Sequence, residues 1–143
     1  MADPTALGHS LTLVDGDLVL VDLAGDGGAP AGRTLGEVAG VANLAQALTL
    51  RVLTPAGSDV FNTGYGFDAA DVFTAAAPAR TVRDLLQLNV VRALGTDVRV
   101  REIRDVSFVE PSPRARRAWL VTVTVVTVDG AQQSFTIAVG EPA

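Results

Sequence analysis

The stretch Trp119-Leu-Val-Thr-Val-Thr-Val-Val-Thr-Val128 decides the fold of this chain. Its apolar residues recur at every second position, which is typical of a strand with one buried face. Asp129-Gly130 then predicts a tight turn into a second strand, Gln132 to Val139. A third extended stretch, Val98 to Glu110, precedes the polar connection 111–117. The pattern therefore predicts a three-stranded antiparallel meander.

Two main helices are predicted before the meander. The first opens with a capping-box pattern, Thr34-x-x-Glu37, and ends before Thr54-Pro55, because proline disfavours helical geometry in the preceding residue. The second opens with Thr81-x-x-Asp84 and ends at Gly95, and a short helix is expected over residues 67–77. The apolar residues at helical spacing are Val41, Leu44, Ala45, Leu48 and Val52 in the first helix, and Val82, Leu85, Leu86, Val90 and Leu94 in the second.

The N-terminal region is predicted to be a β-hairpin followed by a loop. Residues 11–14 and 17–23 form its strands, Asp15-Gly16 forms its turn, and the glycine-rich residues 24–33 form the loop. The order of hairpin, helices and meander indicates an α+β fold. We expect one domain, with residues 1–36 as the N-terminal hairpin and flexible loop and residues 37–143 as the α+β part.

The charge of the chain argues against several classes of partner. The 143 residues carry 16 acidic and 11 basic side chains, a net charge of −5, and no cysteine. This balance disfavours binding to nucleic acid, and the absence of cysteine excludes disulfides and thiolate metal sites. We expect no signal peptide and no membrane insertion, hence a cytoplasmic protein. All the basic residues are arginine, and nine of them lie between residues 80 and 117, where they could pair with partner carboxylates.

The sequence offers no group of residues typical of an active site. His9 is the only histidine, and we expect a solvated side chain near the N-terminus rather than a catalytic base. Asp15-Gly-Asp17 lacks the spacing of a calcium-binding EF-hand loop, and phosphate-binding glycine motifs are absent. We therefore predict no catalytic residue, no metal ligand and no cofactor.

A family resemblance enters at Asn43-Leu-Ala-Gln-Ala-Leu-Thr-Leu-Arg-Val-Leu-Thr-Pro-Ala-Gly57, followed by Tyr65-Gly66. This block resembles the baseplate wedge and sheath-initiator family of contractile tails and contractile injection systems. Its members show a leucine-rich R-x-L-T-P-x-G segment, a Y-G loop, a second helix and a β-meander. The resemblance covers residues 37–139. The family's Glu-Pro-Arg tripeptide corresponds here to Asp97-Val98-Arg99, which keeps the acid and the arginine but not the proline.

The resemblance implies a structural part rather than an enzyme. Such proteins lie in six copies at the baseplate around the inner tube or hub, dock on wedge proteins, and offer β-strands to the first ring of sheath protein. Here the C-terminal hairpin would present the open edge on which a partner strand pairs. The residues that we expect to contact partners are Asn43, Gln46, Arg51, Tyr65, Gly66, Asp97, Arg99, Arg101, Phe135, Ile137 and Val139.

Two other functions stay open at this point. A muralytic, lysozyme-like enzyme needs two carboxyl groups flanking a sugar-binding cleft, and the sequence singles out no such pair. A small-ligand-binding α+β module would enclose a pocket between its sheet and its helices. The sequence also does not distinguish a phage tail from a secretion apparatus or a free injection particle.

Overall fold

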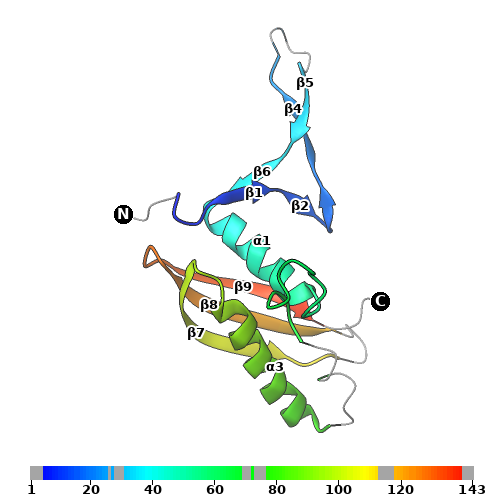
Figure 1. Ribbon diagram of the computed structural model, residues 1–143, viewed down its shortest axis with the longest axis vertical. Helices are drawn as coiled ribbons and strands as arrows, with labels where there is room; N and C mark the ends of the chain where they lie inside the picture. The colour runs from blue at the N-terminus through cyan, green and yellow to red at the C-terminus, as the bar shows by residue number, and fades with distance from the viewer. Residues whose placement is uncertain are drawn as a thin grey trace. The chain divides into compact units, whose positions relative to one another are not determined.

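The computed structural model describes residues 5–25, 27, 31–68, 72, 77–112 and 118–139 (Figure 1). The chain divides into two compact units, Asp3–Gln46 and Ala47–Ala143, and the boundary falls inside helix α1, Gly40–Leu53. The first unit contains small two-stranded sheets, and the second contains a three-stranded sheet. The predicted mixture of helices and antiparallel strands is therefore confirmed.

The described part of the first unit contains three antiparallel strand pairs. The pairs are β1, His9–Leu11, with β6, Glu37–Ala39; β2, Leu13–Val14, with β3, Asp17–Leu18; and β4, Leu20–Leu23, with β5, Gly32–Leu35. Asp15 and Gly16 have φ angles of 52° and 89°, as a type I′ turn requires. The chain does not form a single hairpin over residues 11–23. Instead it forms short strand pairs, in which β5 and β6, within residues 32–39, pair with the earlier strands β4 and β1. His9 is thus an exposed strand residue.

Helix α1 begins at Gly40, so the helix start predicted at Thr34 is wrong. Thr34 lies in β5 and Glu37 lies in β6, where their backbone groups belong to antiparallel ladders. Strand pairing prevails over the capping pattern because it satisfies a whole row of amides and carbonyls. The predicted loop also ends earlier, because Gly32 and Arg33 already belong to β5. Gly40 has a φ of 63°, which lets the chain leave β6 and enter the helix without a side-chain clash.

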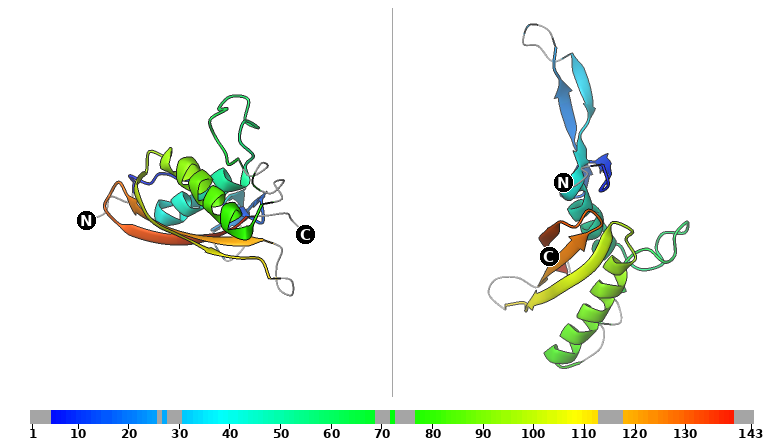
Figure 2. Two further views of the ribbon diagram at one scale, coloured as in Figure 1. Left: turned by 90° about the horizontal axis from the view of Figure 1, so that it is seen from below. Right: turned by 90° about the vertical axis from the view of Figure 1, so that its left-hand side faces the viewer.

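The second unit packs α3, Ala79–Gly95, on one face of a three-stranded antiparallel sheet (Figure 2). The sheet has the order β7-β8-β9, with β7 at Val100–Val109, β8 at Trp119–Thr127 and β9 at Gln132–Val139, which confirms the predicted meander. Every second residue of β8 is buried, and each fully buried valine contributes about 1.5–3 kcal/mol. Among the described residues of this unit, the buried apolar ones are Leu48, Val52, Phe67, Val72, Leu86, Val90, Ala93, Leu94, Trp119, Val121, Val123, Val125, Ile137 and Val139.

Helix α3 confirms the second predicted helix but starts earlier than expected. Its N-cap residue is Pro78, whose carbonyl accepts the N–H groups of Thr81 and Val82 at 2.9 and 3.1 Å. Thr81 therefore lies inside the first turn, and the expected Thr81–Asp84 capping box is not formed, because Pro78 already takes the N-cap position. The short helix predicted over residues 67–77 falls mainly on residues outside the described ranges.

The turn between β8 and β9 differs from the turn at Asp15-Gly16. The Gly130 N–H donates to the Thr127 carbonyl at 2.9 Å, and the Thr127 N–H donates to the Ala131 carbonyl at 2.9 Å. Gly130 has a φ of 85°, whereas Asp129 keeps a negative φ. The connection is thus three residues long, 128–130, with its glycine in the left-handed region. It fixes the register of the C-terminal hairpin.

Candidate functional site

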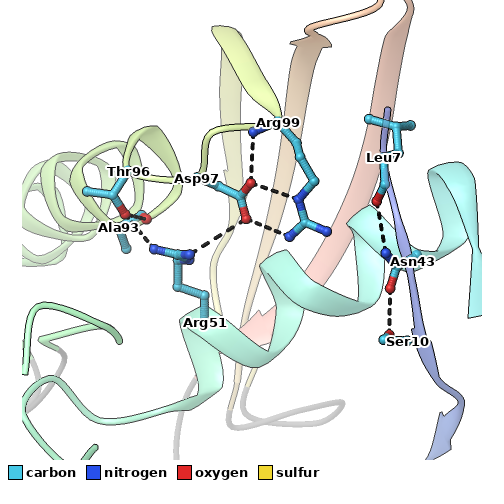
Figure 3. A network of polar contacts seen from close by, with 8 residues as sticks. All are labelled: Leu7, Ser10, Asn43, Arg51, Ala93, Thr96, Asp97 and Arg99. Atoms are coloured by element: carbon cyan, nitrogen blue, oxygen red, sulfur yellow. Dashed lines mark hydrogen bonds and ion pairs between the residues drawn. The ribbon is translucent and has the colours of Figure 1, made fainter. Parts of the chain in front are cut away.

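Asp97 and Arg99 form an ion pair inside the second unit (Figure 3). The Arg99 side chain donates from Nε to Asp97 Oδ1 at 2.9 Å and from Nη2 to Asp97 Oδ2 at 2.8 Å. The Arg99 backbone N–H adds a third bond to Oδ1 at 3.0 Å. Asp97 is only 5% exposed, so this two-pronged pairing compensates a buried carboxylate. The guanidinium that we expected to bind a partner is held by the chain's own acid.

Arg51, in the last turn of α1, approaches the same carboxylate from another side. Its Nη1 donates to Thr96 Oγ1 at 2.5 Å, and its Nη2 lies 3.6 Å from Asp97 Oδ2. The Thr96 hydroxyl in turn donates to the Ala93 carbonyl at 2.8 Å, near the end of α3. The Arg51 guanidinium carbon lies 4.6 Å from the centre of the Tyr65 ring, in cation–π geometry. Arg51 therefore connects helix α1, the 57–66 loop and the α3–β7 connection.

The charges of this cluster favour a structural role over an acid–base role. Hydrogen bonds from the Arg99 side chain hold the pKa of Asp97 below its ordinary value of 3.8, although burial acts in the opposite direction. The same hydrogen bonds raise the pKa of Arg99. A carboxyl group whose pKa lies below that of an ordinary aspartate is poorly suited to act as a general acid near neutral pH. The cluster therefore serves to hold the backbone of the second unit.

Gly66 brings the Tyr65 loop against the end of α1. The Phe67 N–H donates to the Thr54 carbonyl at 2.8 Å, and the Ala56 N–H donates to the Phe67 carbonyl at 3.1 Å. Gly66 has a φ of 111°, and a Cβ atom at this position would lie 2.6 Å from the Thr54 oxygen. A side chain cannot be accommodated there without moving the backbone. The R-x-L-T-P and Y-G segments, which are separate in the sequence, thus meet in one structural cluster.

Asn43 and Gln46 have an equivalent role within the first unit. The Asn43 Nδ2 donates to the Leu7 carbonyl at 2.9 Å, and its Oδ1 accepts a bond from Ser10 Oγ at 2.5 Å (Figure 3). The Gln46 Oε1 accepts a bond from the Leu13 N–H at 2.9 Å. Asn43 is buried, and both side chains satisfy backbone groups of the segment around β1. These two expected contact residues are thus engaged by their own chain.

The remaining four expected contact residues lie in the sheet. Arg101 is exposed on β7, at the edge opposite to β9. Ile137 and Val139 are buried, and Phe135 is half-buried on the same side of β9. Their side chains therefore pack into the core. What β9 can present to a partner is its backbone edge and its exposed side chains.

The register of the hairpin shows which backbone groups of β9 face outward. In the described residues β9 pairs only with β8, and hydrogen-bonded pairs alternate along an antiparallel ladder. Counting from the Thr127–Ala131 bond, the amides directed at β8 are those of Gln133, Phe135, Ile137 and Val139. The amides directed away from β8 are those of Gln132, Ser134, Thr136 and Ala138.

The sequence did not indicate the role of Thr96 or the exposure of Phe61. Thr96 receives the Arg51 hydrogen bond, and its position next to Gly95 at a helix end was the available signal. Phe61 is 97% exposed, and no periodic pattern could have indicated this because the residue lies in an irregular loop.

Within the described ranges, no group of three or more histidine, cysteine, aspartate or glutamate residues is arranged to hold a metal ion. Among the same residues, no helix combines the length and the apolar character that crossing a bilayer demands. Models of known protein families give no match to the sequence, and curated proteins give none either. Function must therefore be inferred from the geometry together with the motif resemblance.

Proposed function

We propose that the protein is a structural baseplate component of a contractile tail or contractile injection system, assembled into its particle in the cytoplasm. In this proposal six copies surround the inner tube or hub and dock on wedge proteins. Each copy starts the sheath by pairing strand β9 with a strand of the first ring of sheath protein. The observation that carries the proposal is the character of β9 as an edge strand.

Strand β9 lacks the features that normally protect the edge of a sheet. Its sequence, Gln-Gln-Ser-Phe-Thr-Ile-Ala-Val, contains no charged residue and no proline. Its eight residues pair with β8 in unbroken register, without a bulge. Natural proteins usually blunt long edges with charges, prolines or bulges, because an open edge is a template for another strand. An unprotected edge is what a strand-accepting protein needs.

The exposed face of the hairpin suits an added strand of small polar residues. Thr122 and Thr136 share a hydrogen bond between their hydroxyl oxygens at 2.8 Å, and Thr124 and Ser134 share one at 2.7 Å. These rows run across β8 and β9 toward the open edge. A partner strand carrying serine or threonine in the same rows would extend both ladders.

The arginine cluster supports the proposal in a different way. Arg51, Asp97 and Arg99 hold the end of α1, the end of α3 and the start of β7 together. A strand-presenting surface needs a rigid scaffold, because a partner strand pairs well only with a fixed register. In this proposal the cluster of Arg51, Asp97 and Arg99 supports the sheet, and β9 pairs with the strand of the sheath protein.

The proposal is tested by substituting proline at an outward-facing amide of β9. Deleting the strand would be uninformative, because Ile137 and Val139 belong to the core. Ser134→Pro removes one donor from the open edge and places a ring there, while its amide makes no ladder bond to β8. We expect sheath assembly on baseplates to fall by about tenfold or more, which corresponds to the loss of one or two hydrogen bonds.

Ser134→Ala is the matched control, because it removes the hydroxyl bond to Thr124 and keeps the amide. We expect this variant to assemble nearly as much sheath as the unaltered chain, because one hydroxyl row contributes less than a backbone hydrogen bond at an edge that stays open. Circular dichroism and thermal melting would establish that both variants fold. Electron microscopy would count sheathed particles, and the amount of this chain in purified baseplates would be measured in parallel. Normal sheath on baseplates that contain the proline variant would contradict the proposal.

A further inference from the structure

The apolar side of β9 is covered unevenly along the strand. Ile137 and Val139 are 2% and 4% exposed, whereas Phe135 on the same side is only half-buried. Phe135 is thus the large apolar side chain of this row that still meets water. Covering the rest of its surface releases free energy in proportion to the apolar area buried. A strand added beside β9 would therefore gain from an apolar side chain opposite Phe135.

The spacing of the ladder decides which side chains of an added strand would come closest to β9. Residues opposite each other in an antiparallel pair alternate between hydrogen-bonded pairs, about 5.5 Å apart at Cα, and non-hydrogen-bonded pairs, about 4.5 Å apart. Toward β8, Phe135 and Ile137 form hydrogen-bonded pairs, so toward a strand on the open side they would form the closer pairs. The apolar row would make the tightest side-chain contacts with the added strand.

The polar side of β9 has the opposite arrangement. Ser134 and Thr136 belong to the closely spaced pairs with β8, and their hydroxyl oxygens lie 2.7 and 2.8 Å from those of Thr124 and Thr122. Toward the open edge, the same two residues would instead form the wider pairs, each exchanging two backbone hydrogen bonds with the residue opposite. A short hydroxyl side chain opposite them would continue the row, but it would contribute less than the closer apolar contacts.

We propose that β9 selects an antiparallel strand by its alternation, with apolar residues opposite Phe135 and Ile137 and serine or threonine opposite Ser134 and Thr136. The apolar positions carry most of the selectivity, because they form the close pairs. The direction follows the other pairings of the sheet, which are all antiparallel. The inference rests on the proposed function in taking β9 as a strand acceptor, and it adds the side-chain chemistry and the direction of the accepted strand.

The inference is tested with two synthetic peptides that are matched to β9 in length and carry a lysine at each end. Valine and threonine alternate in one peptide, and the other has the same residues with the valines together. Each peptide is titrated into the isotope-labelled, full-length chain, and the amide signals are followed by NMR. We expect the alternating peptide to bind at least about tenfold more tightly, because only this peptide covers the apolar row along its length.

The same titration reports where the peptide binds. The outward amides of Ser134 and Thr136 should shift more than the inward amides of Phe135 and Ile137. Equal affinities for the two peptides would overturn the inference, and so would binding of neither peptide or larger shifts at the inward amides.

A nitroxide label at the N-terminus of the alternating peptide tests the direction. An antiparallel strand begins beside the end of β9, so the amide signal of Val139 should broaden more than that of Gln132. The reverse order would overturn the antiparallel direction.

Two variants of one residue separate this inference from the proposed function. Ser134→Pro should weaken binding of the alternating peptide by about tenfold, whereas Ser134→Ala, which keeps the amide, should change it by less than about threefold. Selective peptide binding together with normal sheath on Ser134→Pro baseplates would count against the proposed function and leave the inference in place. Sheath that fails on those baseplates without any peptide selectivity would overturn the inference and leave the proposed function in place.

Discussion

The two edges of the three-stranded sheet are built in opposite ways. Strand β7 carries Arg101, Glu102, Arg104 and Asp105, and its pairing with β8 is interrupted by two register shifts. Strand β9 has neither charges nor irregularities. Charges and bulges are the ordinary devices that prevent edge-to-edge association. This sheet therefore protects one of its edges, β7, and leaves the other, β9, regular.

The largest expected effect on stability comes from breaking the Asp97–Arg99 ion pair, which lies at the start of β7, the protected edge strand. Arg99 precedes β7, pairs with buried Asp97, and its carbonyl accepts the Val128 N–H at 3.0 Å. Arg99→Ala leaves the carboxylate with the backbone N–H of residue 99 and the more distant Arg51, and we expect a loss of about 3 kcal/mol in the free energy of unfolding. The measurement is urea denaturation of the purified chain.

Arg101→Ala is the matched control for this change, because Arg101 is exposed on β7 only two residues away. Its effect on stability should stay within about 0.5 kcal/mol. Equal stabilities of the two variants would show that the Asp97–Arg99 pair does not hold the protected edge.

Lowering the pH should reduce the stability by a smaller amount, and it acts through the same ion pair. The pKa of Asp97 is lowered in the folded state, so the unfolded chain binds the proton more readily. The pair therefore contributes its full stability above the ordinary aspartate pKa of about 4, and this contribution is lost as the pH falls through the lowered folded value. Urea unfolding measured from neutral to acid pH should show this loss. In Asp97→Asn the free energy of unfolding should depend less steeply on pH. Parallel curves for the variant and the unaltered chain would argue against a contribution of Asp97 to the acid sensitivity.

The smallest effect on stability is expected from removing two of the four charges of β7. Arg104→Thr combined with Asp105→Thr, made in the Ser134→Pro chain so that β9 is blocked, should change stability by no more than about 0.5 kcal/mol. The same variant should self-associate more strongly, because β7 then keeps only two of its four charges, Arg101 and Glu102. Sedimentation velocity would measure this, with Ser107→Thr as the neutral control. A variant as monomeric as that control would mean that the register shifts alone protect β7.

The parts of the fold predicted correctly are those where one pattern dominates. The alternation along Trp119–Thr127 is compatible with only one choice of buried face. Helix α3 has a clear apolar stripe, and the helix ends at a glycine. The start of α1 was predicted wrongly because Thr34 and Glu37 satisfy a local capping rule, whereas their actual strand partners, Val21 and Leu11, lie 13 and 26 residues earlier in the chain. A pairing at that distance leaves no trace in the capping pattern.

The candidate site was predicted as a set of residues but not as a set of roles. Arg51, Tyr65, Gly66, Asp97 and Arg99 were all selected from the sequence, and the structure brings them into one cluster. Sequence cannot tell whether an arginine beside an acid pairs within the chain or across an interface, because both use the same chemistry. The direction of the β9 amides depends on register, which only the turn geometry reveals.

Gly57 and Gly66, two of the three glycines in the 57–66 loop, differ in the substitutions that they would tolerate over evolutionary time. A Cβ atom on Gly57 would meet no atom within 4 Å, so only its φ of 76° restricts the residue, and asparagine or aspartate can adopt that angle. At Gly66 a Cβ atom would collide with the Thr54 and Pro55 carbonyl groups. Distant relatives that keep this loop should therefore retain glycine at position 66 long after position 57 has changed.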